Sequence, residues 1–93
     1  MVTEKERTAV GEVARCAPIS GLQYTYRLLY TAGGYPYIEV IAEDKRGIRR
    51  EKSGLFPPDG RLARAFFALL VRCEVSPLSL VEVYDEFLAQ HLR

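Results

Sequence analysis

The chain has 93 residues, of which 48% are hydrophobic and 27% charged, with a formal net charge of +1. These values are typical of one small soluble domain built around a single core. The nearly balanced charge argues against a general nucleic-acid-binding protein. No apolar run approaches the ~18 residues of a membrane-spanning helix. The charged residues 1–7 do not resemble a signal peptide, so the sequence predicts a cytoplasmic protein with no membrane association.

The N-terminal part of the chain carries the weakest pattern. Residues 1–8 are charged and lack apolar periodicity, which predicts a disordered segment ahead of a single domain over residues 9–93. Residues 9–16 fit a strand, because Val10, Ala14 and Cys16 alternate toward one side, but they fit a short helix nearly as well. Both alternatives stay open at this stage.

Three further segments have the composition of strands. Residues 23–31 and 36–44 are rich in aromatic and β-branched types and alternate between apolar and polar positions. Residues 48–53 are predicted to form a short edge strand, where arginine and lysine discourage pairing with another chain. Turn-forming residues separate all three segments.

The register of the central hairpin follows from the same alternation. A two-residue loop at Gly33–Gly34 would pair Leu28 with Glu39 and place a carboxylate on the apolar face. An odd loop length or a bulge pairs Leu28 with Ile38 or Val40 instead. We therefore expect a three-residue or bulged turn, with the strand tyrosines facing the helices.

Two segments at the C-terminal end have helical periodicity. Residues 59–73 begin at Asp59, a suitable N-cap, and are apolar around most of the helix, so they need the sheet on one side and the next helix on the other. Residues 77–92 begin after Ser76, with Pro77 in the first turn, or three residues later at a capping box that starts with Ser79. The second helix has one apolar face, which comprises Leu80, Val81, Tyr84, Phe87, Leu88 and Leu92.

These elements together predict an α+β fold in two layers. The first layer is an antiparallel meander of three or four strands, and the second is a C-terminal helical hairpin packed on one face of that sheet. The short connection at Cys73–Pro77 predicts that the two helices are antiparallel neighbours.

A sequence motif in this helical region resembles a known family. The linker Val75-Ser76-Pro77 and the following Leu-x-x-Val-x-Asp-Glu-Phe-Leu run are similar to a family of small bacterial proteins known only as a domain of unknown function. The resemblance extends to the Tyr24-x-Tyr26 strand and implies a β-hairpin followed by two helices. Family members often carry histidine where this chain has Ser79. The family has no assigned activity, so the resemblance supplies no functional residues.

Basic residues are concentrated in one part of the sequence. Residues 45–64 contain seven basic and two acidic residues, whereas residues 74–93 contain four acidic residues and one arginine. The basic segment could contact phosphates or steer a protein partner, or it could simply protect the sheet edge. The aromatic side chains expected to be exposed beside the turn extend this candidate set. The candidate binding residues are Lys45, Arg46, Arg49, Arg50, Arg64, Tyr35 and Tyr37.

Catalytic chemistry has little support in the sequence. His91 is the only histidine, and Glu82 and Glu86 share the outer face of a helix rather than a cleft. Cys16 and Cys73 match no metal or redox spacing and are expected to be reduced, partly buried thiols. The sequence therefore predicts a protein that is not an enzyme and uses no cofactor or metal.

The leading functional hypothesis is a small protein–protein interaction module, expected to form a homo-oligomer such as a homodimer. A core of this size is marginal, one helix is largely apolar, and the surface carries opposed charged segments. The alternative is nucleic-acid or nucleotide binding through the basic segment 45–64.

Overall fold

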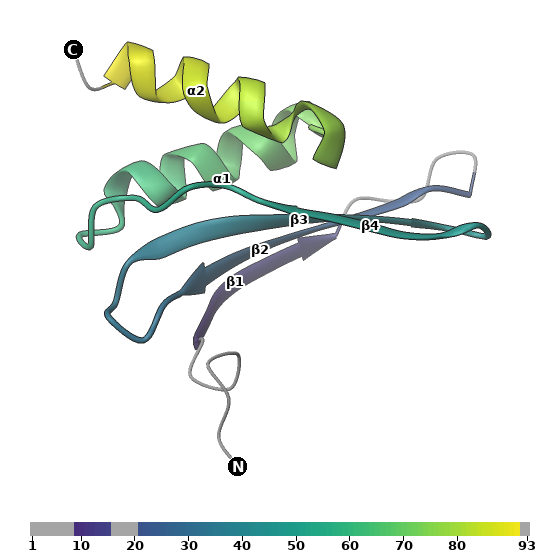
Figure 1. Cartoon of the computed structure of the whole chain (residues 1–93), viewed down its shortest axis with the longest axis horizontal. Helices are drawn as coiled ribbons and strands as arrows, with labels where there is room; N and C mark the ends of the chain where they lie inside the picture. The colour runs from purple at the N-terminus through teal and green to yellow at the C-terminus, as the bar shows by residue number, and fades with distance from the viewer. Residues whose placement is uncertain (1–8, 16–20, 92–93) are drawn as a thin grey trace.

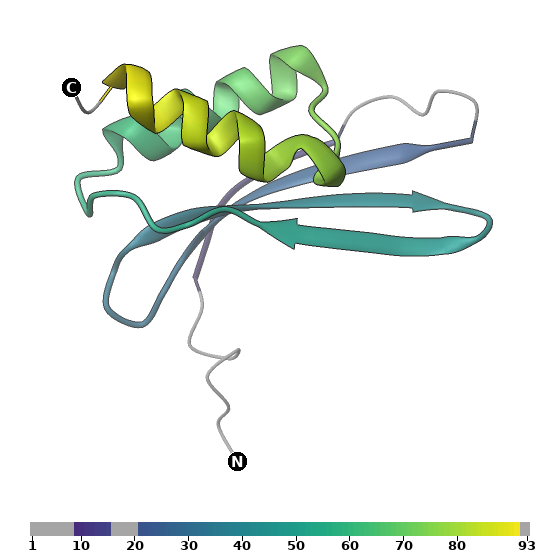
Figure 2. The same ribbon diagram turned by 45° about the horizontal axis from the view of Figure 1, so that its top comes forward.

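The protein is a two-layer α+β fold, seen here in a computed structural model that describes residues 9–15 and 21–91. Four antiparallel strands form a sheet in the order β1-β2-β3-β4, and the helices pack on one face of it (Figures 1 and 2). The predicted fold class is therefore confirmed. The elements are β1 (Ala9–Arg15), β2 (Gln23–Tyr30), β3 (Pro36–Asp44), β4 (Gly47–Lys52), α1 (Arg61–Cys73), the 3₁₀ turn η2 (Pro77–Ser79) and α2 (Leu80–His91).

Strand β1 settles the choice that the sequence left open. Residues 9–15 are a strand that pairs antiparallel with β2, and the register shifts between Val10 and Glu12. Such a shift is a β-bulge, in which one strand carries an extra residue. The predicted last residue, Cys16, and the predicted disordered segment 1–8 lie outside the described residues.

The β2–β3 hairpin has the predicted register, with Leu28 opposite Ile38. The backbone N–H of Gly34 donates to the carbonyl of Thr31 at 2.9 Å, and the N–H of Thr31 donates to the carbonyl of Tyr35 at 3.0 Å. Gly34 has a φ of 88°, the left-handed conformation of the bulge residue in a three-residue hairpin loop. The prediction of a three-residue or bulged turn is confirmed.

The tyrosines of β2 face the helices, as expected. Tyr26 is fully buried, and its hydroxyl donates to the carbonyl of Val75 in the connection between the helices, at 2.9 Å. Tyr24 and Tyr30 are partly buried against the same core. This strand therefore ties the sheet to the helical layer.

The N-cap of helix α1 lies one residue after the predicted one. Gly60 is the N-cap, so the assignment of Asp59 to that position is wrong. The chain turns first, with the N–H of Gly60 bonded to the carbonyl of Pro57, and Gly60 takes a φ of 79° that favours glycine. Asp59 nevertheless accepts the N–H of Arg61 through Oδ1 at 3.0 Å, which satisfies one free amide of the first turn.

The start of the second helix combines both predicted positions. Ser76 precedes η2, in which Pro77 occupies the first turn, where a missing amide costs no hydrogen bond. Helix α2 itself begins at Leu80, directly after Ser79. This extra 3₁₀ turn changes the direction of the chain before the α-helix starts, and it positions Leu78 at the surface.

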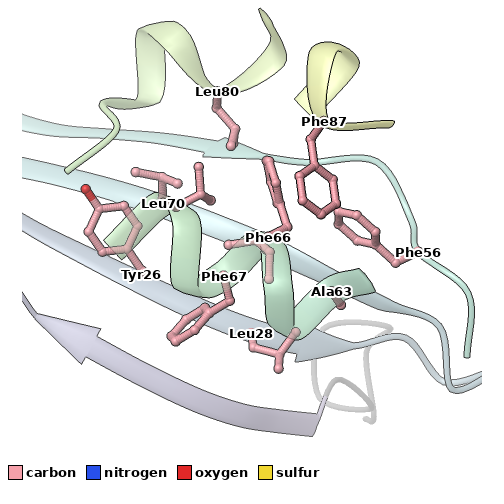
Figure 3. Packing of buried hydrophobic residues seen from close by; sticks show 11 residues of the cluster. Tyr26, Leu28, Phe56, Ala63, Phe66, Phe67, Leu70, Leu80 and Phe87 are labelled. Carbon is pink, nitrogen blue, oxygen red and sulfur yellow. The ribbon is translucent and has the colours of Figure 1, made fainter. Parts of the chain in front are cut away.

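The core lies between the helices and the sheet (Figure 3). Phe66 of α1 is fully buried, with ring centroids 5.4 Å from Phe56, 5.0 Å from Phe87 and 5.8 Å from Tyr84. Helix α1 is thus covered by β2 and β3 on one side and by side chains of α2 on the other, as its apolar circumference predicts. The cluster comprises Tyr26, Leu28, Ile38, Val40, Phe56, Ala63, Phe66, Phe67, Leu70, Leu80 and Phe87.

Two apolar positions are more exposed than the periodicity predicts. Cys73 is a free, exposed thiol, so its expected partial burial is wrong. It is the last residue of α1, and the left-handed Glu74 turns the chain away immediately after it. Val81 is 56% exposed. It lies about 100° around the helix from the buried Leu80, at the margin of the apolar face.

Candidate functional site

The β3–β4 hairpin presents four of the predicted binding residues. Lys45, Arg46, Arg49 and Arg50 are all exposed on a hairpin that projects beyond the helices, toward the right in Figures 1 and 2. The turn is stabilised by Asp44, whose Oδ1 accepts the backbone N–H of Arg46 at 2.8 Å. The hairpin therefore holds a basic tip away from the core.

Strand alternation divides these arginines between the two faces of the sheet. Arg49 lies opposite Ala42, on the face that the helices cover, whereas Arg50 lies opposite Ile41 on the other face. We call this second face the helix-free face, because no helix in the described part of the chain packs on it. The two neighbouring arginines cannot contact one small ligand together.

A groove of about 370 Å³ opens on the helix side, between the hairpin and η2. Arg46 and Arg49 bring positive charge to it, and Asp44 brings one negative charge. Leu78 forms part of its wall and is 73% exposed. The full lining comprises Leu22, Tyr24, Ala42, Asp44, Arg46, Gly47, Ile48, Arg49, Ser76, Pro77 and Leu78.

On the helix-free face, Arg50 is engaged in an ion-pair network. Its Nη1 lies 3.8 Å from Oε2 of Glu39, and Nη1 of Arg27 lies 3.1 Å from Oε1 of the same carboxylate. Glu39 is only 5% exposed. A carboxylate buried to this degree needs such partners, and it offsets part of the positive charge that both arginines bring to this face.

The remaining predicted residues lie apart from the hairpin tip. Tyr37 is on the helix-free face, where Nζ of Lys52 lies 5.9 Å from the centre of its ring. Tyr35 is 45% exposed in the β2–β3 loop, and Arg64 is exposed on α1, one turn after its first residue. The β2–β3 loop and the start of α1 are at the opposite end of the molecule from the β3–β4 turn (Figure 1). The structure thus brings Arg46 and Arg49 together at the groove, with Lys45 in the adjacent turn, and separates the others.

Exposed apolar side chains gather beside the edge strand β4. We define the β4 side as this strand with Ile48, Leu55, Leu78 and Val81, which are 55%, 54%, 73% and 56% exposed. Leu78 belongs to η2, which contacts β4. The carbonyl of Leu55 accepts the Tyr84 hydroxyl, one turn of α2 after Val81. Of the six large apolar side chains exposed in the described residues, Ile48 belongs to β4 and Leu78 to η2, Leu55 follows β4 by three residues, and Val81 follows Leu78 by three.

Sequence reasoning did not identify the β4 side. Helical periodicity predicts Val81 on the buried face of α2, because it gives the position of a residue around the helix but not how far the neighbouring layer extends. The sequence does contain a signal for Leu78. This residue follows Pro77 in a 3₁₀ turn, so its side chain does not follow the helical periodicity of α2.

Two titratable side chains have defined local contacts on α2. The hydroxyl of Tyr84 donates to the carbonyl of Leu55 at 3.1 Å, and burial together with the neighbouring Asp85 carboxylate raises the pKa of this tyrosine. The His91 ring stacks on Phe87 with centroids 4.1 Å apart, and its Nδ1 lies 2.9 Å from the Phe87 carbonyl. Both side chains therefore have partners within their own packing environment, and neither lines the groove.

Within residues 9–15 and 21–91, no three histidine, cysteine, aspartate or glutamate side chains are arranged to hold a metal ion. None of the described helices is long and apolar enough to cross a membrane. Comparisons with protein-family models, curated proteins and solved structures found no match. The resemblance to a family of small bacterial proteins therefore stays a prediction.

Proposed function

We propose that the protein is a small non-enzymatic module that binds another protein chain through the β4 side. The observation that carries this proposal is an edge strand with exposed apolar side chains on it and in the η2 turn that contacts it. Exposed apolar side chains next to an unpaired strand edge are typical of a protein interface, where the partner buries them.

The backbone of β4 supports the same surface. The N–H of Ser53 bonds to the carbonyl of Ile38, and bonded pairs recur at every second residue of an antiparallel ladder. The backbone groups of Ile48, Arg50 and Lys52 therefore point away from β3. Because β4 is an edge of the sheet, these groups offer a partner strand a row of donors and acceptors.

The groove adds a preference for the chemistry of the partner. The lining carries two positive charges, on Arg46 and Arg49, and one negative charge, on Asp44. Leu78 belongs both to this lining and to the β4 side. An extended segment with apolar side chains and at least one carboxylate would complement this combination.

A peptide-display selection against the purified protein tests the proposal. We expect enriched peptides that combine apolar and acidic residues, and a loss of affinity of about tenfold in a Leu78→Gln/Val81→Gln variant. Val13→Gln is the matched control, because Val13 is 46% exposed at the other edge of the sheet. Failure to enrich any peptide, or equal binding by all three proteins, contradicts the proposal.

One observation favours a second candidate, which is single-stranded nucleic acid bound on the helix-free face. Tyr37 and Lys52 lie together there, beside Arg27 and Arg50, and an aromatic ring flanked by cations can stack a base and contact its phosphates. The test is a titration with a fluorescent oligonucleotide at two salt concentrations. Binding that weakens with salt and is lost in Tyr37→Ala supports this candidate, and absence of binding excludes it.

A further inference from the structure

The exposed edge of β4 matches a second copy of the same strand. We infer that two copies of the protein pair β4 against β4, antiparallel, about a two-fold axis that passes through Arg50. The two sheets then continue into one. This inference rests on the proposed function, because it uses the same surface, and it names the partner.

Hydrogen-bond geometry restricts the possible registers to a few. Only Ile48, Arg50 and Lys52 point their backbone groups outward, so a bonded pair must place two of these residues opposite each other. With two-fold symmetry, the registers that keep at least two such pairs are centred on Arg49, Arg50 or Glu51. Registers centred between two residues would leave the outward groups unmatched.

Charge selects one of these three registers. Centring on Arg49 places that arginine opposite itself, and centring on Glu51 places glutamate opposite glutamate and Arg50 opposite Lys52. Centring on Arg50 instead places Arg49 of each copy opposite Glu51 of the other, so two favourable pairs form. The two Arg50 side chains then approach each other, but each lies 3.8 Å from its own Glu39 carboxylate, which offsets the repulsion.

The apolar residues of the β4 side fit the same arrangement. In this register the Ile48 end of one strand lies opposite the Lys52 end of the other. Leu78 borders the first end and Leu55 follows the second, so Leu78 of one copy lies toward Leu55 of the other, twice. These side chains are 73% and 54% exposed in the single chain, and pairing removes apolar surface from water.

The same charges limit unwanted pairing of this unpaired edge strand. Arginine and lysine on an edge strand discourage pairing with unrelated strands. In β4, Glu51 is the single acidic residue among three basic ones, and only the register centred on Arg50 uses it twice. The charges of β4 therefore disfavour pairing with most strands and favour pairing with a second copy of β4.

Single-cysteine variants test the register directly, in a background where Cys16 and Cys73 are replaced by serine. In the register centred on Arg50, the two copies of residue 50 have Cα atoms about 5.5 Å apart, within the range of about 4.4–6.8 Å that a disulfide spans. We expect mild oxidation to give a covalent dimer of Arg50→Cys. Arg49→Cys and Glu51→Cys should stay unlinked, because their own copies lie about 8 Å apart. Preferential linking at position 49 or 51 overturns the proposed register.

A charge-exchange series measures the two predicted ion pairs without cysteine chemistry. Arg49→Glu and Glu51→Arg each place like charges opposite each other twice, and each should weaken the dimer about tenfold. The double variant Arg49→Glu/Glu51→Arg exchanges both charges and should recover the original affinity. Sedimentation equilibrium of the folded variants gives these constants. Additive losses in the double variant contradict the pairing.

The outcomes separate this inference from the proposed function. A wild-type mass that stays at 10.5 kDa at every concentration overturns the dimer, while the peptide selection still decides the proposed function. A dimer that is insensitive to the charge-exchange series also overturns the inference. Loss of peptide binding and of the dimer in Leu78→Gln/Val81→Gln supports both.

Discussion

Replacing Tyr26 with phenylalanine removes one hydroxyl from the centre of the fold and keeps the ring in place. The side chain is fully buried, and the hydroxyl donates to the Val75 carbonyl at 2.9 Å. This bond joins strand β2 to the connection that leads into η2, and therefore to the position of Leu78.

The expected cost follows from the surroundings of the two bonded groups. A typical hydrogen bond contributes about 1 kcal/mol net, and a fully buried acceptor left without a partner costs up to about 3 kcal/mol. Val75 is half-buried, so water can reach part of its backbone. We therefore expect the free energy of unfolding to fall by about 1–1.5 kcal/mol, with a decrease in Tm of about 4–8 °C per kcal/mol for a domain of this size.

Urea unfolding followed by circular dichroism measures this change, provided that the slope of the transition is the same in both proteins. Tyr24→Phe is the matched control, because Tyr24 is on the same strand face and is only partly buried. Its loss should stay within about 0.5 kcal/mol. Equal losses in the two variants, or a stabilised Tyr26→Phe protein, would refute the role assigned to this hydrogen bond.

Three other predictions concern the packing and titration of the same core. Phe66→Ala removes a fully buried ring that contacts three others, and urea unfolding should show a loss of about 3–5 kcal/mol; a loss below about 1 kcal/mol would contradict the described core. Gly54→Ala places a Cβ 2.8 Å from Cζ of Tyr84 and should cost about 1–3 kcal/mol, whereas Gly33→Ala, with its nearest contact at 3.6 Å, should change stability by less than about 0.5 kcal/mol. Because the folded protein raises the pKa of Tyr84, the stability that its protonated hydroxyl contributes is fully present below the ordinary pKa of 10.0 and is lost as pH rises through the folded value. The free energy of unfolding should therefore fall above pH 10 more steeply than in Tyr84→Phe. Parallel pH profiles of the two proteins would contradict this.

The sheet was predictable because its signals are local and periodic. Alternation along β2 and β3 determines which residues share a face, and a carboxylate such as Glu39 cannot join the apolar face without cost. That constraint was enough to predict a three-residue or bulged turn, and the structure shows Gly34 in its left-handed position. Helix positions followed from 3.6-residue periodicity, but the exact cap at Gly60 depended on a preceding turn whose geometry composition alone does not specify.

The candidate site was harder to predict because it depends on contacts between distant elements. Arg49 and Arg50 are adjacent in sequence, and strand alternation separates them, but only the packed helices determine which one borders the groove. The burial of Glu39 depends on arginines from two different neighbouring strands. Val81 is exposed although it adjoins the apolar face of α2, because helical periodicity does not indicate how far the neighbouring layer extends.

Amide hydrogen exchange resolved by residue is the most direct test of β4 as the contact surface. The backbone N–H groups of Arg50 and Lys52 point away from β3, so in a single chain they should exchange rapidly with water. We predict that their exchange slows as protein concentration rises, while the amide of Val13 on the opposite edge is unaffected. Fast exchange of Arg50 and Lys52 at every concentration would contradict a β4-to-β4 contact.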